Sequence, residues 1–201
     1  MQQLIVATRN AHKTREIQQI LGPKFEVRGL LDDDKVAELC ESGKSFEENA
    51  KIKATTVSRQ LQGLVIADDS GLEVEALGGA PGIYSARYGG ASIENKEKIA
   101  KVLEALARIG VKGDRRKARF RCVLALARNG QILGTFEGTV EGLIADCPRG
   151  TCGFGYDPIF VPDGFKQSFG ELSPELKNHV SHRGQAVRAL AAKLAALQTA
   201  N

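Results

Sequence analysis

The sequence predicts a mixed α/β fold, and three observations lead to this class. Short apolar, β-branched runs alternate with segments whose apolar residues recur at helical spacing. An Asn129-Gly130 pair separates two segments of alternating apolar and polar residues, a pattern typical of a β-hairpin. Hydrophobic residues make up 42% of the chain and charged residues 26%, which is enough apolar material for a core. Interleaved strands and helices together with a hairpin indicate a mixed sheet rather than a purely parallel one.

Length and charge narrow the class further. The 201 residues predict one domain, residues 1–201, with two lobes around a cleft. A net charge of +4 is too small to imply nucleic-acid binding by itself. No apolar run approaches the roughly 20 residues that span a bilayer, and no secretory signal is visible. We therefore expect a cytoplasmic protein without a membrane or nucleic-acid partner. The cysteines show no zinc-site spacing, and a Cys147–Cys152 bridge is the less favoured interpretation.

Three strands and two helices are predicted in the first third of the chain. The strands cover Leu4 to Ala7, Phe25 to Leu30 and Leu64 to Ala67. Asn10 caps the first helix, and Gly22-Pro23 ends it. Ser45 and Glu48 form a capping box for the second helix, which runs to about Leu61. The stretch between these helices, residues 32–43, is polar and shows no clear period.

The remaining elements follow from the same signals. Residues 78–90 are rich in glycine and proline and predict an irregular segment. Helices are expected around Ile99 to Ile109, after the Ser173-Pro174 cap, and over the apolar positions from Val187 to Leu197. Strands are expected at Ala118 to Ala127, Gln131 to Glu137, Thr139 to Ala145 and Ile159 to Val161. Cys122 falls among apolar neighbours and is expected to be a small core residue.

A dense basic run, Lys112 to Arg121, has two interpretations. It can be a solvated loop entering a strand, or a patch for a phosphate backbone. The first interpretation is favoured. Common nucleotide-binding motifs fail: the Walker A pattern before Gly43-Lys44-Ser45 has Glu38 in place of its first glycine, and Pro158 replaces the third glycine after Gly153-Phe154-Gly155.

Two polar clusters remain at expected strand ends. Residues Thr8-Arg9-Asn10-Ala11-His12-Lys13 form a strand-to-helix turn with backbone amides and a cation, which suits an anion. Alternatively, Asn10 only caps the helix and Lys13 is only solvated. Asp68-Asp69-Ser70-Gly71 directly follows a buried strand, where adjacent carboxylates repel each other and need a cation or amide donors. An Asx-rich turn explains this second cluster equally well.

Two further clusters lie in the last third of the chain. Gly153-Phe154-Gly155-Tyr156-Asp157-Pro158 would present two exposed aromatic rings for stacking on a planar ligand, unless Phe154 packs into the core. Lys177 and Ser181-His182-Arg183-Gly184, expected between two helices, offer a charge for phosphate and in-plane donors for a carbonyl. Together the four clusters supply a carboxylate that could bind a metal, cations that could bind phosphates, aromatic rings for stacking and polar hydrogen-bond donors. These are the chemical groups that a nucleoside-triphosphate site requires.

At this point the sequence resembles a known family, the dITP/XTP (inosine triphosphate) pyrophosphatases. The resemblance rests on six motifs in order, which span the chain from Thr8 to the last helix. These motifs are Thr8-x-Asn10-x-x-Lys13, Ser45-Phe46-x-Glu48-Asn49-Ala50, Ile66 to Leu72, Leu77 to Tyr88, Gly153 to Pro158 and Ser181 to Ala186. The resemblance implies an elongated, twisted mixed sheet flanked by helices, with two lobes around a substrate cleft. It also implies a homodimer that hydrolyses ITP, dITP and XTP with Mg²⁺ to the monophosphate and pyrophosphate.

The resemblance also implies a role for each matching residue. Asp69 matches the proton acceptor and a metal ligand, and Glu41 is the candidate second metal ligand. The substrate-binding positions are Thr8, Arg9, Asn10, Ala11, His12, Lys13, Lys53, Ser70, Phe154, Gly155, Tyr156, Asp157, Lys177, His182 and Arg183. Among these, Thr8 to Lys13, Lys53 and Lys177 would contact phosphates, Phe154 to Asp157 the base and sugar, and His182 and Arg183 the purine edge. Two positions depart from the family pattern: Cys40 stands where relatives often carry an acid, and Cys152 replaces a glycine.

Two rival functions remain at this stage. One is a related pyrophosphatase that acts on pyrimidine nucleotides such as dTTP or UTP. The other is a non-catalytic nucleic-acid-binding module that uses the basic run, which predicts strongly salt-dependent binding.

Overall fold

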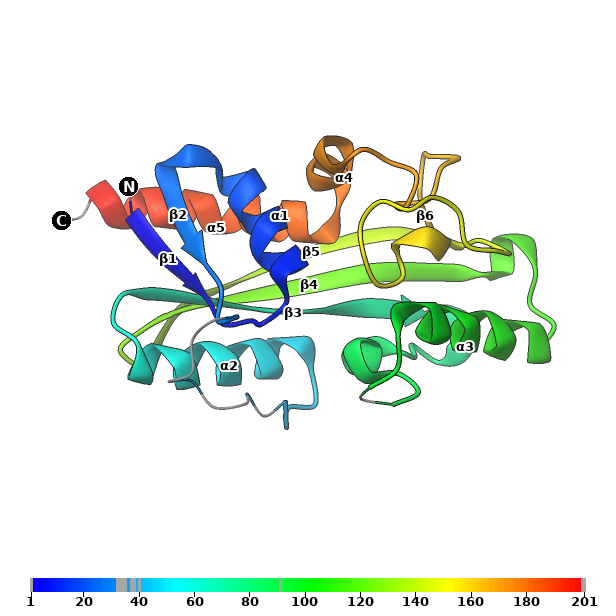
Figure 1. Cartoon of the computed structure of the whole chain (residues 1–201), viewed down its shortest axis with the longest axis horizontal. Coiled ribbons are helices and arrows are strands. Elements are labelled where there is room, and N and C mark those ends of the chain that lie inside the picture. Colours follow the sequence, from blue (N-terminus) through cyan, green and yellow to red (C-terminus); the bar gives the residue numbers. More distant parts are fainter. Residues whose placement is uncertain (1, 32–35, 37–38, 40, 91, 200–201) are drawn as a thin grey trace. The chain divides into compact units, whose positions relative to one another are not determined.

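One mixed six-stranded sheet flanked by helices forms the framework of the computed structural model, in the order β2-β1-β3-β4-β5-β6 (Figure 1). The structure describes residues 2–31, 36, 39, 41–90 and 92–199. The strands are β1 (Gln2–Val6), β2 (Phe25–Arg28), β3 (Leu64–Val74), β4 (Lys117–Arg128), β5 (Gln131–Ile144) and β6 (Phe160–Pro162). Strand β1 pairs in parallel with β2 and β3, whereas β5 and β6 are antiparallel. The predicted mixed α/β class is confirmed.

Local signals begin and end the helices as expected. The α-helices are α1 (Ala11–Leu21), α2 (Phe46–Gln60), α3 (Asn95–Arg108), α4 (Pro174–Val180) and α5 (His182–Thr199). The Asn10 side chain accepts hydrogen bonds from the backbone amides of His12 and Lys13, and Gly22 ends α1 with φ 69°. The Ser45 side chain accepts a bond from the amide of Glu48, which confirms the cap that begins α2, whereas the Glu48 carboxylate accepts from the amide of Lys44 instead of the Ser45 amide of a full capping box. None of the helices in the described part of the chain is long and apolar enough to cross a membrane.

The chain divides into two compact units, and each has its own apolar core. The first unit comprises residues 1–69, 122–138 and 182–201, and the second comprises residues 70–121 and 139–181. That residues 1–201 act as one domain stays a prediction.

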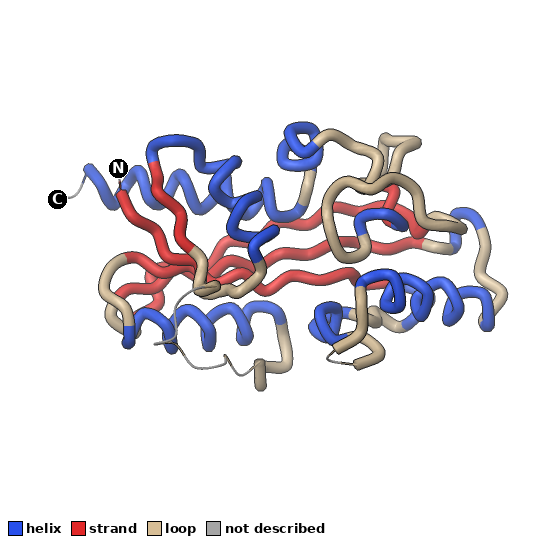
Figure 2. The backbone as a smooth tube through the Cα atoms, in the orientation of Figure 1, coloured by secondary structure: helices blue, strands red, loops and turns tan. Residues whose placement is uncertain are grey.

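The first unit covers both faces of its strands. Helices α1 and α5 lie on one side of the strands and α2 on the other (Figure 2). Because side chains alternate along a strand, Ile66 of β3 and Leu124 of β4 join Ile17 of α1 and Leu190 of α5 in one core cluster. The residues between them on the same strands point to the opposite face, toward α2. This alternation therefore determines the face of the sheet to which each polar side chain of β3 points.

The second unit is held by aromatic packing. Phe120 of β4, Phe160 of β6 and Phe169 form a buried trio with ring centroids 4.8 to 6.0 Å apart. Tyr156 is buried beside this cluster, and its hydroxyl donates to the backbone oxygen of Ser85 at 3.0 Å. The prediction of two exposed rings in this loop is therefore wrong for Tyr156, because its ring packs into the apolar core of the second unit.

Three further predictions are corrected. Strand β3 does not end before Asp68 but continues to Val74, so the Asx-turn alternative is wrong as well. The two strands expected from Gln131 to Ala145 form one continuous strand, β5. His182 and Arg183 lie in the first turn of α5 rather than in a connection between helices. The hairpin turn is confirmed: Asn129 takes φ 52° and Gly130 φ 78° between β4 and β5.

Two arginines of the basic run make internal contacts, whereas Lys112, Arg115 and Lys117 are exposed. Arg116 is buried and donates to the backbone oxygens of Ile144 and Ala145 at 2.8 and 2.7 Å. Arg119 pairs with Glu73 at 2.6 Å. Residues 113–115 form a short 3-10 turn ahead of β4, which favours the interpretation as a loop entering a strand.

Candidate active site

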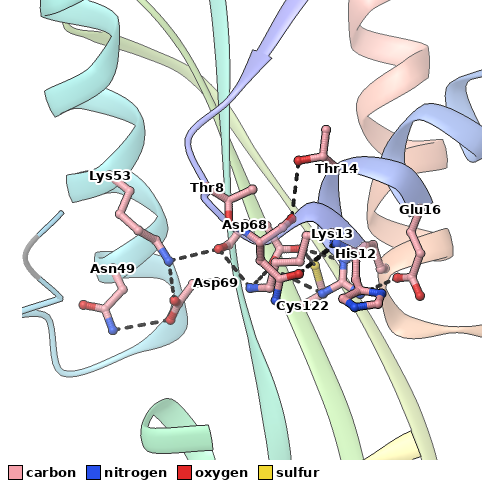
Figure 3. A network of polar contacts seen from close by, with 12 residues as sticks. Thr8, His12, Lys13, Thr14, Glu16, Asn49, Lys53, Asp68, Asp69 and Cys122 are labelled. Atoms are coloured by element: carbon pink, nitrogen blue, oxygen red, sulfur yellow. Dashed lines mark hydrogen bonds and ion pairs between the residues drawn. The ribbon is translucent and has the colours of Figure 1, made fainter. Parts of the chain in front are cut away.

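Asp68 and Asp69 lie side by side in the middle of β3, yet their carboxylates point to opposite faces of the sheet (Figure 3). Asp68 shares the face of Ile66 and meets residues from α1, β4 and α5. Asp69 points toward α2. The predicted compensation by cations is confirmed, because each carboxylate has its own cationic partners on its face of the strand.

Asp69 lies in a cluster with two residues of α2 and one acid. Its Oδ1 accepts a bond from Lys53 Nζ at 2.6 Å, and its Oδ2 accepts one from Asn49 Nδ2 at 3.3 Å. Lys53 Nζ also donates to Glu41 Oε1 at 3.0 Å and to the backbone oxygen of Asp68 at 2.9 Å. Asn49 and Lys53 are four residues apart on α2, so helical geometry presents both to the strand.

Asn49 also fixes the segment that carries Glu41. Its Oδ1 accepts a bond from the backbone amide of Gly43 at 2.8 Å. A Cβ at Gly43 would lie 2.7 Å from the same Asn49 oxygen, so only glycine fits this approach without displacement. Cys40, the first departure from the family pattern, lies outside the described residues.

The electrostatics of this cluster favour a reactive carboxylate. Burial raises the pKa of Asp69, and Lys53 and Lys13 oppose that rise only in part while Glu41 adds to it. For Lys53, burial works to lower the pKa, but Asp69 and Glu41 outweigh it and the pKa is raised. Lys53 therefore stays charged at neutral pH between two carboxylates.

Asp68 has the opposite electrostatic balance. It is 1% exposed, and it accepts bonds from Lys13 Nζ at 2.5 Å, Arg183 Nε at 2.8 Å and the thiol of Cys122 at 3.3 Å. Burial works to raise the pKa of Asp68, but Arg183 and Lys13 hold it well below its ordinary value. Asp68 is thus a permanently charged anchor for two cations.

The Thr8–Lys13 turn leads into this cluster from β1. The Thr8 hydroxyl accepts a bond from the amide of Asn10 at 3.1 Å, which shapes the turn before α1. Arg9 donates to the backbone oxygen of Val36 at 2.7 Å, while Ala11 and His12 are exposed. A cavity of about 410 Å³ adjoins the turn and is lined by Thr8, Arg9, Ala11, Thr14, Arg15, Gln18, Val27, Arg28, Gly29 and Leu31.

The second unit holds the other predicted substrate residues together. Asp157 Oδ2 accepts bonds from Lys177 Nζ at 2.6 Å and from the amide of Phe154 at 2.7 Å. The Lys177 ammonium lies 4.9 Å from the centre of the half-buried Phe154 ring. Gly153 takes φ 74°, and a Cβ there would lie 2.0 Å from Asp157 Oδ2, so this glycine is required. Cys152 needs no such freedom, because Asn129 is the only non-glycine residue with positive φ in the described ranges.

The donor set near Asp69 fits a hard divalent cation. Carboxylate oxygens of Asp69 and Glu41 both lie within 3.0 Å of a single point, the Lys53 ammonium. Mg²⁺ is commonly held by one or two carboxylates, with water and substrate phosphates completing its shell. Over the part of the chain that the structure describes, no group of three or more His, Cys, Asp or Glu side chains would form a metal cage. Two carboxylates therefore match the open kind of site that Mg²⁺ uses.

The predicted site residues thus fall into two groups by unit. The first unit holds Thr8 to Lys13, Glu41, Lys53, Asp69, His182 and Arg183, and the second holds Ser70, Phe154 to Asp157 and Lys177. Within the second unit, Lys177 contacts the residues predicted for base and sugar. Arg183 is 2% exposed and bonded to two carboxylates, and its predicted contact with a purine edge stays a prediction.

Sequence reasoning missed four residues of these clusters. They are Glu16, Asn49, Asp68 as an anchor, and Cys122 as a partner of that anchor. The spacing of four between Asn49 and Lys53 is a signal that was available. Period-two alternation along β3 would have separated Asp68 from Asp69, had the strand been extended through them.

The fold and the site together define a class: an α/β protein in which two buried aspartates on neighbouring positions of one strand pair with lysines from two helices. The chain belongs to the Ham1 family, whose model matches residues 4–193. A dITP/XTP pyrophosphatase of Bacillus licheniformis is 48% identical over 195 residues, 96% of this chain and 98% of that protein. The Bacillus subtilis protein of the same name is 44% identical, with 98% of each chain covered. The solved structure of a HAM1 protein from Coxiella burnetii has a TM-score of 0.85 and 39% identity, with 97% of this chain and 99% of that chain covered.

Proposed function

We propose that this protein hydrolyses ITP, dITP and XTP to the nucleoside monophosphate and pyrophosphate with Mg²⁺, and so removes deaminated purines from the nucleotide pool. The observation that carries the proposal is the pair of lysines, Lys13 and Lys53, that reach Asp68 and Asp69 from two faces of one strand. The relatives named dITP/XTP pyrophosphatase, aligned over nearly the whole chain, support the substrate class.

The cations of the first unit would bind the triphosphate. Lys13 and Lys53 supply two ammonium groups, and the Thr8–Lys13 turn adds the N-terminus of α1. Their charge would also stabilise the pyrophosphate as it leaves. Asp69 and Glu41 would hold Mg²⁺, which when bound supplies further charge neutralisation at the phosphates.

Asp69 would act as the proton acceptor. A water molecule attacks the α-phosphorus, the bond from this phosphorus to the bridging oxygen breaks, and pyrophosphate leaves with the bond's electrons. Asp69 takes the proton of the attacking water. Burial favours this role because it raises the pKa of Asp69 and so makes its carboxylate a stronger base. Asn49, bonded to Oδ2, holds the carboxylate in one orientation.

The remaining predicted contacts complete the proposal. Phe154, Gly155, Tyr156 and Asp157 would hold the base and sugar, with the contribution of Tyr156 coming from its backbone because its ring is buried. Ser70, Lys177, His182 and Arg183 are proposed as further substrate contacts. We also propose a homodimer, which the family resemblance implies, and a cytoplasmic location, which we expect from the lack of an apolar span or secretory signal in the sequence; light scattering and cell fractionation test them.

The decisive experiment is incubation of the pure protein with ITP and Mg²⁺, with both phosphate products quantified. Pyrophosphate in equal amount to IMP is expected, and EDTA should stop the reaction. Release of orthophosphate instead would exclude the reaction class. Turnover of ITP, XTP, dTTP and GTP measured side by side tests the substrate class, and a preference for dTTP would establish the pyrimidine alternative. Neutralising Lys112 and Arg115, which lie in the basic run, should leave ITP turnover unchanged.

A further inference from the structure

Arg183 is the largest fully buried side chain of the described residues, and it lies between two carboxylates. Its Nη1 donates to Glu16 Oε2 at 2.6 Å, and its Nε donates to Asp68 Oδ2 at 2.8 Å. All three residues belong to the first unit. A guanidinium with this burial and these partners is fixed in orientation, because its donors form a rigid planar fork.

The same Asp68 carboxylate binds Lys13 with its other oxygen. Lys13 Nζ lies 2.5 Å from Asp68 Oδ1, which also accepts a longer bond from Arg183 Nη2 at 3.5 Å. Oδ2 accepts bonds from Arg183 Nε and from the Cys122 thiol. Glu16, Arg183, Asp68 and Lys13 therefore alternate in charge along one chain of contacts. Glu16 and Lys13 are three residues apart on α1, so this chain begins and ends on the same helix (Figure 3).

The arrangement determines where the Lys13 ammonium lies. Lysine has a flexible four-carbon stem, so its position depends on the group that binds its end. Arg183 donates to both oxygens of the Asp68 carboxylate, through Nε to Oδ2 and through Nη2 to Oδ1, and so sets the rotation that points Oδ1 at Lys13. A change at Arg183 alters that rotation and releases the ammonium without touching Lys13 itself.

We propose that Arg183, oriented by Glu16, is a positioning residue that acts through Asp68 on Lys13, and so strengthens triphosphate binding without contacting the phosphates. The inference rests on the proposed function, in which Lys13 binds phosphate. It is separate from the predicted contact of Arg183 with the purine edge. A ligand that has phosphates but no base distinguishes the two roles.

The test is a calorimetric titration with inorganic tripolyphosphate in EDTA, which prevents its cleavage. Four proteins are compared: wild type, Arg183→Lys, Glu16→Gln and the control Arg188→Lys, an exposed arginine on the same helix. Arg183→Lys keeps the charge but loses the fork, and its Kd should rise about tenfold. Glu16→Gln should raise the Kd about threefold. The control should match wild type.

Thermal melting of each variant identifies a temperature at which all four proteins are folded. At that temperature, a purely structural role of Arg183 would leave the Kd for tripolyphosphate unchanged. An unchanged Kd in Arg183→Lys with weaker binding of IMP would overturn the inference in favour of base recognition alone. Should Arg183→Lys fail to fold, an unchanged Kd in Glu16→Gln overturns it equally. A wild-type protein that does not bind tripolyphosphate overturns it as well, whereas pyrophosphate release from ITP judges the proposed function independently.

Discussion

The two faces of strand β3 shift the pKa of an aspartate in opposite directions. Asp68, on the face of α1 and α5, has a pKa held far below its ordinary value by Arg183 and Lys13 against the effect of burial. Asp69, on the face of α2, has a pKa raised by burial, which Lys53 and Lys13 do not fully offset. Two adjacent aspartates therefore have pKa values shifted in opposite directions, because the pleat of the strand sends their side chains into different surroundings.

The charge balance on the two faces explains the difference. Asp68 and Glu16 together meet two cations, Arg183 and Lys13, whereas Asp69 and Glu41 share the single ammonium of Lys53. The first face is neutral as it stands. The second retains excess negative charge, which a divalent cation would balance. The charges on the Asp68 face therefore balance among themselves, whereas those on the Asp69 face do not.

Removing the carboxylate charge of Asp69 should have the largest effect on activity. Asp69→Asn is nearly isosteric but abolishes basicity and weakens metal binding, so turnover should fall by about 10²–10⁴ or more. The melting temperature should hold or rise slightly, because the substitution removes a charge whose burial is unfavourable. Pyrophosphate release from ITP and thermal melting measure both, with the exposed Asp163→Asn as the control. A folded Asp69→Asn protein with most of its activity would contradict the assignment of the base.

Removing the carboxylate charge of Asp68 should mainly lower the free energy of unfolding. Asp68→Asn leaves the buried Arg183 without its main counter-charge, which costs about 3–5 kcal/mol of unfolding free energy. Denaturant unfolding of Asp68→Asn and Asp69→Asn in parallel tests this difference directly. Equal stabilities of the two variants would contradict the division between an anchor and a base.

Acid should diminish the contrasting contributions of Asp68 and Asp69 to stability. The folded pKa of Asp68 lies below the ordinary value of 3.8, so its stabilisation is present in full above that value and is lost as the pH falls through the folded pKa. The raised pKa of Asp69 has the opposite sign: its ionisation destabilises the fold above the folded pKa, and protonation relieves this as the pH falls. The advantage of wild type over Asp68→Asn should narrow below about pH 3.8, whereas wild type should gain on Asp69→Asn as the pH falls toward that value. Denaturant unfolding between pH 7 and pH 3 measures both differences.

The smallest expected effect concerns Cys122. Burial, and next to it Asp68, raise the pKa of this thiol well above its ordinary value, so it remains a protonated donor to Asp68 Oδ2. Cys122→Ala should cost about 1 kcal/mol of stability through the lost bond, and Cys122→Ser, which keeps a donor, should cost less. Denaturant unfolding ranks the two variants. The reverse order would show that packing rather than the hydrogen bond decides the role of this residue.

Much of the fold was predictable because its signals are local. The caps at Asn10 and Ser45, the stop at Gly22 and the turn at Asn129-Gly130 each depend on hydrogen bonds or dihedral angles within a few residues. The family followed from six motifs that preserve their order along the chain. The polar clusters of the sequence included Lys13 and Asp69, whereas Lys53 was predicted as a phosphate contact only through the family resemblance.

The sequence by itself determined the element types and the family, and it predicted candidate site residues. The tertiary structure alone decided that β3 continues through Asp68 and Asp69, that Tyr156 is buried, and that Arg183 binds Glu16 and Asp68. Two buried carboxylates in a strand violate local preference, and they are stable only when cations from distant helices neutralise them. Arg183 reaches Asp68 across 115 residues of sequence. No local pattern encodes such a contact, because charge compensation depends on where the folded chain brings its helices.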